Sequence, residues 1–257
     1  MAHPRFYISP EQWVLERLTL AGDEAHHCRE VLRVEAGGKL VVFNGLGHEA
    51  TAEIATVAKE RVELRVLQHF KAPRLGVQIE LGQAIPKGKN MDLIVEKATE
   101  LGAAAVIPLL SERTVVQLDA AEGARKREKW QRVAIEAAKQ CGQNWLPEIA
   151  APAPIKTFFE TARYDLMLIA SLQPGARHLK EVLAEVGFPA GRAAANPQRV
   201  LVLVGPEGDF TPAEINLAKT AGCRPMTLGP IILRTETAAI YCLSVLSHEL
   251  FAPLVHS

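Results

Sequence analysis

Side chains able to do chemistry gather in one short segment near the C-terminus, Leu228-Gly229-Pro230-Ile231-Ile232-Leu233-Arg234-Thr235-Glu236-Thr237-Ala238. In this segment the Arg234 guanidinium can stabilise a negative charge, and the Glu236 carboxylate can accept a proton. A core strand does not need such polar residues in succession, and a solvated helix start does not need the apolar turn before them. We therefore predict a small-molecule site here. The alternative interpretation is an Arg-Glu pair that caps the last helix.

Three glycine-containing loops, at residues 171–175, 205–210 and 229–233, each follow a strand-like segment. In open α/β sheets, ligands bind beyond the carboxyl ends of the strands. Glycine in such loops allows the backbone to approach a planar ligand closely and to adopt positive φ. The chain has neither the Gly-x-Gly-x-x-Gly signature of dinucleotide folds nor the Gly-Lys-Ser/Thr signature of a P-loop. An ordinary tight turn remains the alternative for residues 205–208.

Alternating strand and helix patterns position these loops. Strand patterns cover residues 77–81, 104–110, 165–170, 200–204 and 225–228, and helical patterns cover 91–101, 124–141, 178–186, 212–222 and 235–251. Thr211-Pro212-Ala213-Glu214 predicts a capping box at one helix start. Strand–helix–strand units of this length form parallel pairs, so we predict an α/β domain with a mainly parallel sheet.

The first 70 residues show a different pattern, with short strands at 5–8, 39–43, 49–57 and 62–67 and a hairpin turn at Asn44-Gly45. One helix begins near Asp23. This pattern predicts a small β-barrel. Residues 71–74 resemble a linker, so the predicted domains are 1–72 and 73–257.

Composition excludes some classes of protein and leaves others open. The 29 basic and 29 acidic residues cancel, which removes the general charge argument for a nucleic-acid partner. No apolar run approaches the roughly 20 residues of a membrane helix, so we expect no membrane partner and a cytoplasmic location. Adjacent His26 and His27 point in different directions on a helix and lack a suitably spaced third ligand, so we expect no metal site.

Six motifs in order carry a family resemblance: Lys87-Gly88-x-x-Met91-Asp92, Glu96-Lys97-Ala98-Thr99-Glu100-Leu101-Gly102, Ser111-Glu112-Arg113, Ala137-Ala138-Lys139-Gln140-Cys141-Gly142, Gly205-Pro206-Glu207-Gly208 and Leu233-Arg234-Thr235-Glu236-Thr237. Together they resemble the ribosomal RNA uridine-N3 methyltransferases of the SPOUT superfamily. The resemblance spans nearly the whole chain, and the N-terminal part resembles that family's PUA-like RNA-binding domain.

The resemblance implies S-adenosylmethionine as the methyl donor, a C-terminal trefoil knot and a homodimer through the last helix. It implies as substrate a uridine of 16S rRNA in the small ribosomal subunit. Nothing in the periodicity of the sequence predicts the knot. The residues that the resemblance assigns to the cofactor are Leu172, Val204, Gly205, Pro206, Glu207, Gly208, Leu228, Gly229, Ile232, Leu233, Thr235 and Ala238.

Methylation of uracil N3 requires loss of the imide proton and stabilisation of the charge on the flanking carbonyl oxygens. We therefore expect catalytic roles for Arg234, which would stabilise that charge or anchor a phosphate, and for Glu236, which would accept the proton or orient the arginine. Glu207 is the alternative to Glu236. The candidates for RNA phosphate contacts, each of which is equally explained as a surface charge, are Arg5, Arg29, Arg33, Arg113 and Lys139.

Three positions depart from the family pattern. Ile231 and Gln143 stand where the family usually has arginine, and Asp209 stands where a second glycine is common. Two other hypotheses therefore remain open: an RNA-binding protein of the same fold without turnover, and a SPOUT enzyme that acts on a ribose oxygen or on transfer RNA.

Overall fold

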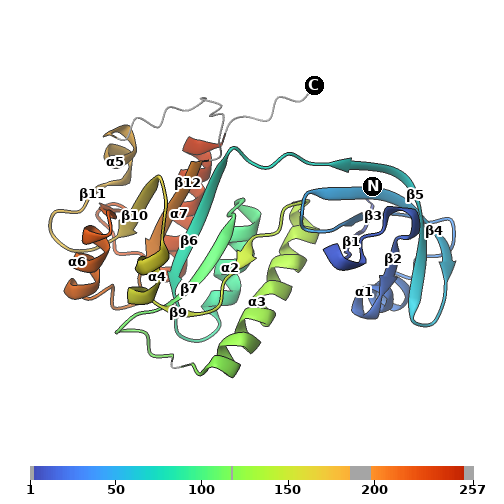
Figure 1. Cartoon of the computed structure of the whole chain (residues 1–257), viewed down its shortest axis with the longest axis horizontal. Coiled ribbons are helices and arrows are strands. Elements are labelled where there is room, and N and C mark those ends of the chain that lie inside the picture. Colours follow the sequence, from blue (N-terminus) through green and yellow to red (C-terminus); the bar gives the residue numbers. More distant parts are fainter. Residues whose placement is uncertain (1–2, 117, 186–197, 252–257) are drawn as a thin grey trace. The chain divides into compact units, whose positions relative to one another are not determined.

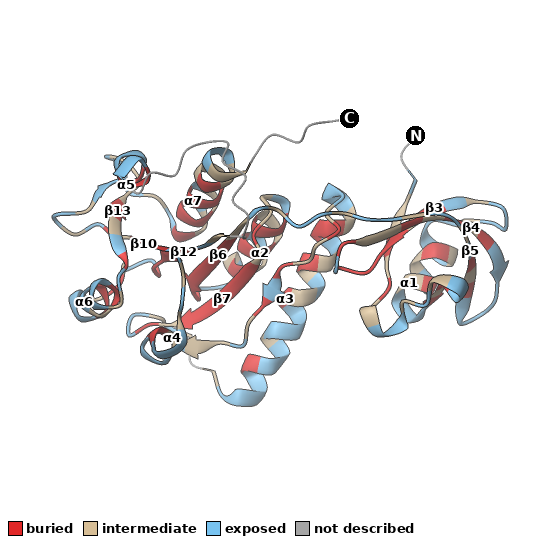
Figure 2. Ribbon diagram, turned by 45° about the horizontal axis from the view of Figure 1, so that its top comes forward, coloured by how far each residue is buried: buried red, intermediate tan, exposed pale blue. Residues whose placement is uncertain are grey.

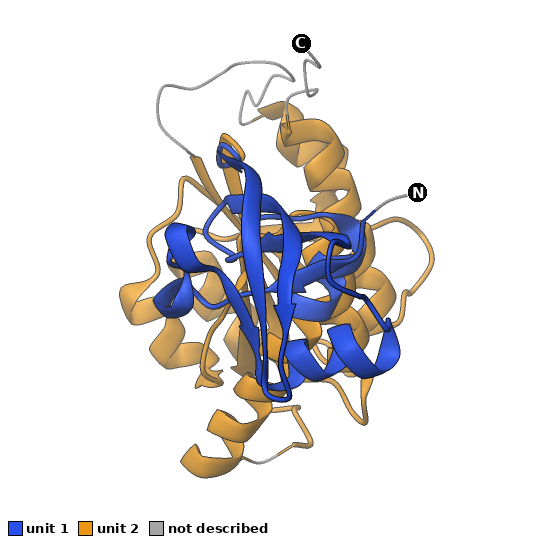
Figure 3. Ribbon diagram, turned by 90° about the vertical axis from the view of Figure 1, so that its right-hand side faces the viewer, with its two compact units in different colours: residues 1–74, 135–146 blue, residues 75–134, 147–257 orange. Residues whose placement is uncertain are grey.

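The computed structural model describes residues 3–116, 118–185 and 198–251, which form two compact units (Figures 1 and 3). Unit 1 comprises Met1–Arg74 and Ile135–Leu146, and unit 2 comprises Leu75–Ala134 and Pro147–Ser257. The first unit therefore includes a later segment that the sequence analysis assigned to the second domain. That segment contains the last residues of helix α3 (Ala120–Cys141), so this one helix belongs to both units.

Unit 1 is built on a five-stranded sheet with the order β1-β3-β4-β5-β2. Its strands are β1 (Arg5–Tyr7), β2 (Thr19–Ala21), β3 (Lys39–Phe43), β4 (His48–Val57) and β5 (Arg61–Lys71). The Asn44-Gly45 turn joins β3 to the antiparallel β4, as predicted. Helix α1 (Gly22–His26) continues into a π-helical turn at His27–Val31, close to the predicted helix start. The short strand β2 was missed, because three residues are too few to establish an alternating pattern.

The segment Ile135–Leu146 is anchored to the strands of unit 1 by specific contacts. The Trp145 indole N–H donates to the Ala72 carbonyl at 3.0 Å, and an Arg5 guanidinium nitrogen donates to Asn144 Oδ1 at 2.8 Å. Gly47 has a φ of +89°, and a Cβ added there would lie 2.6 Å from the Trp145 ring. Glycine is therefore required at this position both by its backbone conformation and by the indole packed against it.

Unit 2 contains one parallel sheet with the order β11-β13-β10-β12-β6-β7-β8, and β9 also pairs with β7. The strands are β6 (Val77–Ala84), β7 (Ala105–Leu110), β8 (Glu148–Ile149), β9 (Ala153–Pro154), β10 (Leu166–Ala170), β11 (Arg177–His178), β12 (Gln198–Val204) and β13 (Arg224–Thr227). Every pairing within the described part of this sheet is parallel. The predicted α/β class and parallel sheet are therefore confirmed.

Two apolar clusters pack on this sheet, and Figure 2 shows the central strands and the inner helix faces as buried. The larger cluster includes side chains of α2 (Asn90–Glu100), α3, α5 (Leu179–Glu185) and α7 (Thr235–Leu250), and the smaller one those of α4 (Ile155–Thr161) and α6 (Pro212–Thr220). A parallel sheet covered on both faces explains the almost continuous apolar run from Val200 to Val204.

The start of helix α6 follows a local sequence signal, whereas other helix starts in unit 2 were missed or shifted. The predicted capping box is present: the Thr211 side chain accepts from the Glu214 N–H, and the Glu214 side chain accepts from the Thr211 N–H. Helix α4 was missed in the sequence, and α3 begins at Ala120, four residues before the predicted start. Cys141, the last residue of α3, is exposed.

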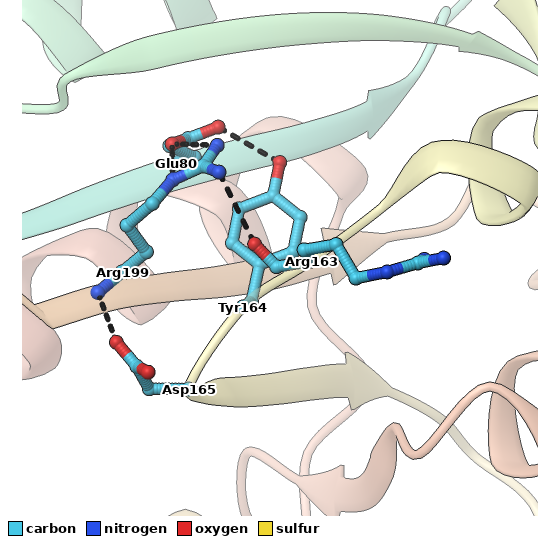
Figure 4. Close-up of polar contacts among 5 residues, drawn as sticks. All are labelled: Glu80, Arg163, Tyr164, Asp165 and Arg199. Atoms are coloured by element: carbon cyan, nitrogen blue, oxygen red, sulfur yellow. Dashed lines mark hydrogen bonds and ion pairs between the residues drawn. The ribbon is translucent and has the colours of Figure 1, made fainter.

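A polar cluster ties neighbouring segments of the parallel sheet together (Figure 4). Glu80, whose side chain is 11% exposed, accepts the Tyr164 hydroxyl at 2.8 Å and two Arg199 guanidinium N–H groups at 3.0 and 2.7 Å. Asp165 accepts the Arg199 backbone N–H at 2.7 Å. Burial and the Glu80 carboxylate raise the pKa of the Tyr164 hydroxyl, so this group remains a donor over the whole neutral range.

Candidate active site

A cavity of about 460 Å³ lies in unit 2, beyond the carboxyl ends of β10, β12 and β13. Its size is within the range of small-molecule sites. The lining residues are Asn90, Ala170, Ser171, Leu172, Val204, Gly205, Pro206, Glu207, Asp209, Thr227, Leu228, Gly229, Ile231, Ile232, Leu233, Arg234, Thr235, Glu236 and Ala238. The cavity therefore brings together all of the predicted cofactor residues except Gly208, and both predicted catalytic residues.

The shape of the cavity depends on backbone conformations that most side chains would obstruct. A Cβ at Gly205 would lie 3.1 Å from the Phe210 backbone nitrogen, so this turn has room only for glycine without a shift of the backbone. Gly229 has a φ of +125°, a conformation that L-residues rarely adopt. These two glycines allow the loops after β12 and β13 to present main-chain groups to a ligand.

Asp209 holds two of these loops together. It has a φ of +60°, where glycine would be unstrained, and its carboxylate accepts the Leu172 N–H at 3.1 Å and the Phe210 N–H at 2.8 Å. Aspartate tolerates this conformation because its short polar side chain bonds to the nearby backbone. The departure from glycine at this position thus links the loop after β10 to the loop after β12.

Buried hydrogen bonds connect Thr235, a lining residue of the cavity, to the loop after β12 and to strand β6. The Thr235 hydroxyl donates to the Gly205 carbonyl at 2.7 Å and accepts from Gln83 Nε2 at 3.0 Å. Gln83 is fully buried and its amide also donates to the Ala84 carbonyl. The sequence analysis missed Gln83, although a glutamine that continues the apolar alternation of Val77, Ile79 and Leu81 is the signal that could have drawn attention to it.

Arg234 and Glu236 stand at the start of α7. Arg234 is the N-cap residue and is exposed at the cavity, and Glu236 is half-buried. Asn90, at the start of α2, donates from its side-chain nitrogen to a Glu236 carboxylate oxygen at 3.3 Å. The other candidate carboxylate, Glu207, accepts the Lys87 N–H at 2.9 Å and so anchors the loop that leads into α2.

The five predicted RNA-contacting residues lie in different surroundings. In unit 1, Arg5 pairs with Glu49 and has a side chain only 15% exposed, and Lys139, at 9%, lies 2.9 Å from Glu24. Arg29 pairs with Glu30 and donates to the Ala58 carbonyl at 3.2 Å. These contacts favour structural roles for the three side chains.

The other two predicted cations are exposed. Arg33 has a φ of +50° and lies at the surface of unit 1. Arg113, in unit 2, donates to the Gly208 carbonyl and so contacts the loop that follows β12. Gly208 itself does not line the cavity. Of the five cations, only Arg113 contacts a segment that forms the candidate site, and Gln143 is absent from the cavity lining.

Among the residues that the structure describes, no group of three or more histidine, cysteine, aspartate or glutamate side chains is arranged to hold a metal ion. None of the described helices has the length and apolar character needed to cross a membrane.

Fold and cavity together define an α/β protein with a small-molecule site and a small β domain, and comparison with known proteins gives its family. An RNA methyltransferase domain model matches residues 73–247, and an RNA methyltransferase PUA domain model matches residues 20–67. The chain therefore belongs to the RNA methyltransferase family that those two models describe.

Relatives extend the similarity over nearly the whole length. Ribosomal RNA small subunit methyltransferase E of Bacillus subtilis is 30% identical over 252 residues, which cover 95% of this chain and 96% of the relative. The same-named protein of Synechocystis is 32% identical over 93% of this chain and 76% of its own length.

Solved structures are similar over the same span. Ribosomal RNA small subunit methyltransferase E of Neisseria gonorrhoeae, bound to S-adenosylmethionine, has a TM-score of 0.82 and 29% identity, and covers 96% of this chain and 97% of its own. A protein of Legionella pneumophila assigned as a methyltransferase, also with bound cofactor, has a TM-score of 0.85 and 35% identity over 96% of this chain and 98% of its own.

Proposed function

We propose that this protein transfers a methyl group from S-adenosylmethionine to N3 of a uridine in 16S rRNA of the small ribosomal subunit. The observation that carries the proposal is a cavity lined by three loops at the ends of parallel strands, with Arg234 and Glu236 among its lining residues. The trefoil knot of the C-terminal segment that the family resemblance implies belongs to the same proposal, and so does the cytoplasmic location expected from the sequence.

The lining of the cavity fits the proposed cofactor. Leu172, Val204 and Leu233 offer apolar contacts to a planar adenine, while the glycine-containing turns offer main-chain groups to its polar edge. When bound, S-adenosylmethionine supplies an electrophilic methyl group on a sulfonium ion. The rest of the reaction depends on groups of the protein that remove a proton and stabilise charge.

In this proposal Glu236 accepts the N3 proton and Arg234 stabilises the charge that spreads onto the uracil carbonyl oxygens. Glu207 remains the alternative base, and its carboxylate accepts the Lys87 N–H at 2.9 Å. A target base in a structured RNA must turn out of its stack to reach such a cavity.

The direct test is mass spectrometry of rRNA nucleosides from a strain that lacks the gene. The proposal expects 3-methyluridine to disappear from 16S rRNA and to return when the wild-type gene is supplied. Unchanged 3-methyluridine together with loss of a ribose methylation or of a tRNA methylation would favour the second enzymatic hypothesis. Absence of S-adenosylmethionine binding by calorimetry would favour the RNA-binding protein without turnover.

Replacement of Ile231 by arginine is expected to strengthen RNA binding. Ile231 is 74% exposed and lines the cavity, so an arginine there would add a cation where RNA is proposed to enter. One added phosphate contact should steepen the slope of log K against log salt by about 0.7–0.9. Dissociation constants at several salt concentrations measure this slope. Ile231→Gln, which removes the apolar side chain without adding charge, is the matched control, and an identical slope for both variants would contradict the prediction.

We also infer that a second copy of this chain covers one face of α7. Side chains on that face line a shallow depression: Thr237, Ile240, Tyr241, Ser244, Val245, His248 and Glu249. Tyr241 on this face is one of the exposed large apolar side chains. An isologous dimer buries the same face of both subunits.

Replacement of Tyr241 by arginine is expected to convert a dimer into a monomer at low micromolar concentration. The added charges would face each other across the two-fold axis of an isologous contact, where burial of like charges is unfavourable. Sedimentation or light scattering measures the mass. Leu93→Arg is the control, because Leu93 has a similar exposure on α2 but lies outside this face. A wild-type protein that is already monomeric would contradict the proposed dimer.

A further inference from the structure

Asn90 lines the candidate active site and contacts the proposed base, although no sequence motif singled it out. Its side-chain nitrogen lies 3.3 Å from a Glu236 carboxylate oxygen, and both residues line the cavity. This is a contact between the first turns of two helices, because Asn90 opens α2 and Glu236 lies in the first turn of α7. The start of each helix carries a partial positive charge that favours an anion nearby.

The pair is held by the surrounding structure. Helix α2 packs against α7. The loop before α2 is anchored by the contact between Glu207 and the Lys87 N–H, and the start of α7 is anchored by the contact between the Thr235 hydroxyl and the Gly205 carbonyl. Asn90 and Glu236 therefore present their polar groups from two supported helix starts rather than from free loops.

The negative charge of the Glu236 carboxylate determines which end of the Asn90 amide lies next to it. An amide oxygen beside a carboxylate would be repelled, so the NH₂ group must face it. That NH₂ group carries two hydrogens, of which one is used for Glu236 and one remains. The Glu236 carboxylate likewise has lone pairs beyond the one that Asn90 uses. The pair thus offers a hydrogen-bond donor beside a hydrogen-bond acceptor.

This donor–acceptor arrangement matches the edge of uracil. Uracil has the N3–H donor flanked by two carbonyl acceptors, so N3–H can donate to Glu236 while one flanking carbonyl accepts from Asn90. Cytosine has an unprotonated N3, which would place a lone pair against the carboxylate in the same position. An unpaired or repelled polar group in a site built for hydrogen bonding discriminates strongly between such analogues.

We propose that Asn90 is a specificity-determining residue of this site, which reads a uracil carbonyl next to N3 while Glu236 accepts the N3 proton. This inference rests on the proposed uridine-N3 methylation. As the proton moves from N3 to the Glu236 carboxylate, negative charge develops on the carbonyl oxygen that Asn90 contacts. The same hydrogen bond therefore selects the base and stabilises the charge that the reaction creates.

The test is a double-mutant cycle in which one change is a protein variant and the other is a modified target base. Small subunits are assembled with 16S rRNA that carries uridine, 2-thiouridine or 4-thiouridine at the target position, because a thiocarbonyl is a weaker acceptor than a carbonyl. Single-turnover rates are measured for wild type and for Asn90→Leu. On uridine, loss of a donor to a charged acceptor should lower the rate about 10- to 100-fold.

With one of the two thio bases, the effects of the protein change and of the base change on the rate should be non-additive. On that base, Asn90→Leu should lower the single-turnover rate by a factor at least about fivefold smaller than on uridine. Any effect of sulfur on the acidity of N3 is common to both proteins and cancels in the cycle. Lys89→Ala is the matched control, since this neighbouring side chain makes no capping hydrogen bond and is absent from the cavity lining, and its effects should be additive. Asn90→Ser replaces Asn90→Leu if the leucine variant does not fold.

Additive effects with both thio bases would overturn the role of Asn90, because a residue that only supports the fold cannot sense the sulfur. That outcome leaves the proposed function intact, provided that wild type forms 3-methyluridine on the unmodified subunits. If wild type forms none there although it binds S-adenosylmethionine, the proposed function fails, and the inference about Asn90 fails with it.

Discussion

Replacement of Glu236 by glutamine is expected to lower the single-turnover rate of uridine methylation by about 100- to 10,000-fold, the usual contribution of a positioned general base. Glutamine keeps the shape of the side chain and can still accept a hydrogen bond from Asn90, but it cannot take up the N3 proton. The expected loss is therefore in the chemical step. Rapid-quench measurement of 3-methyluridine at saturating cofactor and enzyme checks it.

Glu207→Gln is the matched control for this experiment. Glu207 lines the same cavity, but its carboxylate accepts the Lys87 N–H, and a glutamine oxygen can do the same. We expect a rate within a few-fold of wild type. Calorimetry should show S-adenosylmethionine binding for both variants. If Glu236→Gln turns over at a near-normal rate, Glu236 is not the base, and a large loss in Glu207→Gln would transfer that role to Glu207.

Replacement of Arg199 by methionine is expected to destabilise unit 2 by about 2 kcal/mol. Arg199 donates two hydrogen bonds to the largely buried Glu80 (Figure 4), and its removal leaves that carboxylate with the Tyr164 hydroxyl as its remaining partner. Breaking a fully buried pair costs roughly 3–5 kcal/mol, and the loss here should be smaller because the Arg199 side chain is 48% exposed. Native-state hydrogen exchange of amides in β6 and β12 measures the change within unit 2 alone.

The double variant Glu80→Gln with Arg199→Met distinguishes this cause from a simple loss of packing. It removes the buried charge together with its partner, so it should be less destabilising than Arg199→Met alone. Equal destabilisation by the single and the double variant would show that the unpaired carboxylate is not the source of the effect. Because the cluster does not line the cavity, cofactor affinity should stay unchanged in both variants.

Much of the fold could be predicted from the sequence because it depends on short-range patterns. The run of apolar residues from Val200 to Val204 indicates a buried strand wherever its partners lie, and the Thr211–Glu214 capping box forms within one turn of a helix. The family resemblance placed the cofactor residues, and the cavity does contain nearly all of them. Their contacts with the cofactor remain a prediction.

The features that the sequence analysis missed or could not resolve have a common physical origin. Arg5 and Lys139 were candidates for RNA contact because a cation in a sequence has no visible partner, yet Glu49 and Glu24 lie beside them in the folded unit. Helix α4 and strand β2 were missed, and elements of seven and three residues give at most about two repeats of a period, which is a weak signal. Asp209 was noted only as a departure from glycine, and in the structure its carboxylate accepts the Leu172 N–H and so holds that loop.

The sequence by itself determined the class of fold and most of the order of its elements, and it predicted the segment around Arg234 and Glu236 as a place for chemistry, because these depend on neighbouring residues and on motif order. Only the tertiary structure decided which polar groups meet. Asn90 and Glu236 are 146 positions apart, and Gln83 and Thr235 are 152 apart. Such pairs form only when distant helices and strands pack together, and no local period records which side chains that packing brings into contact.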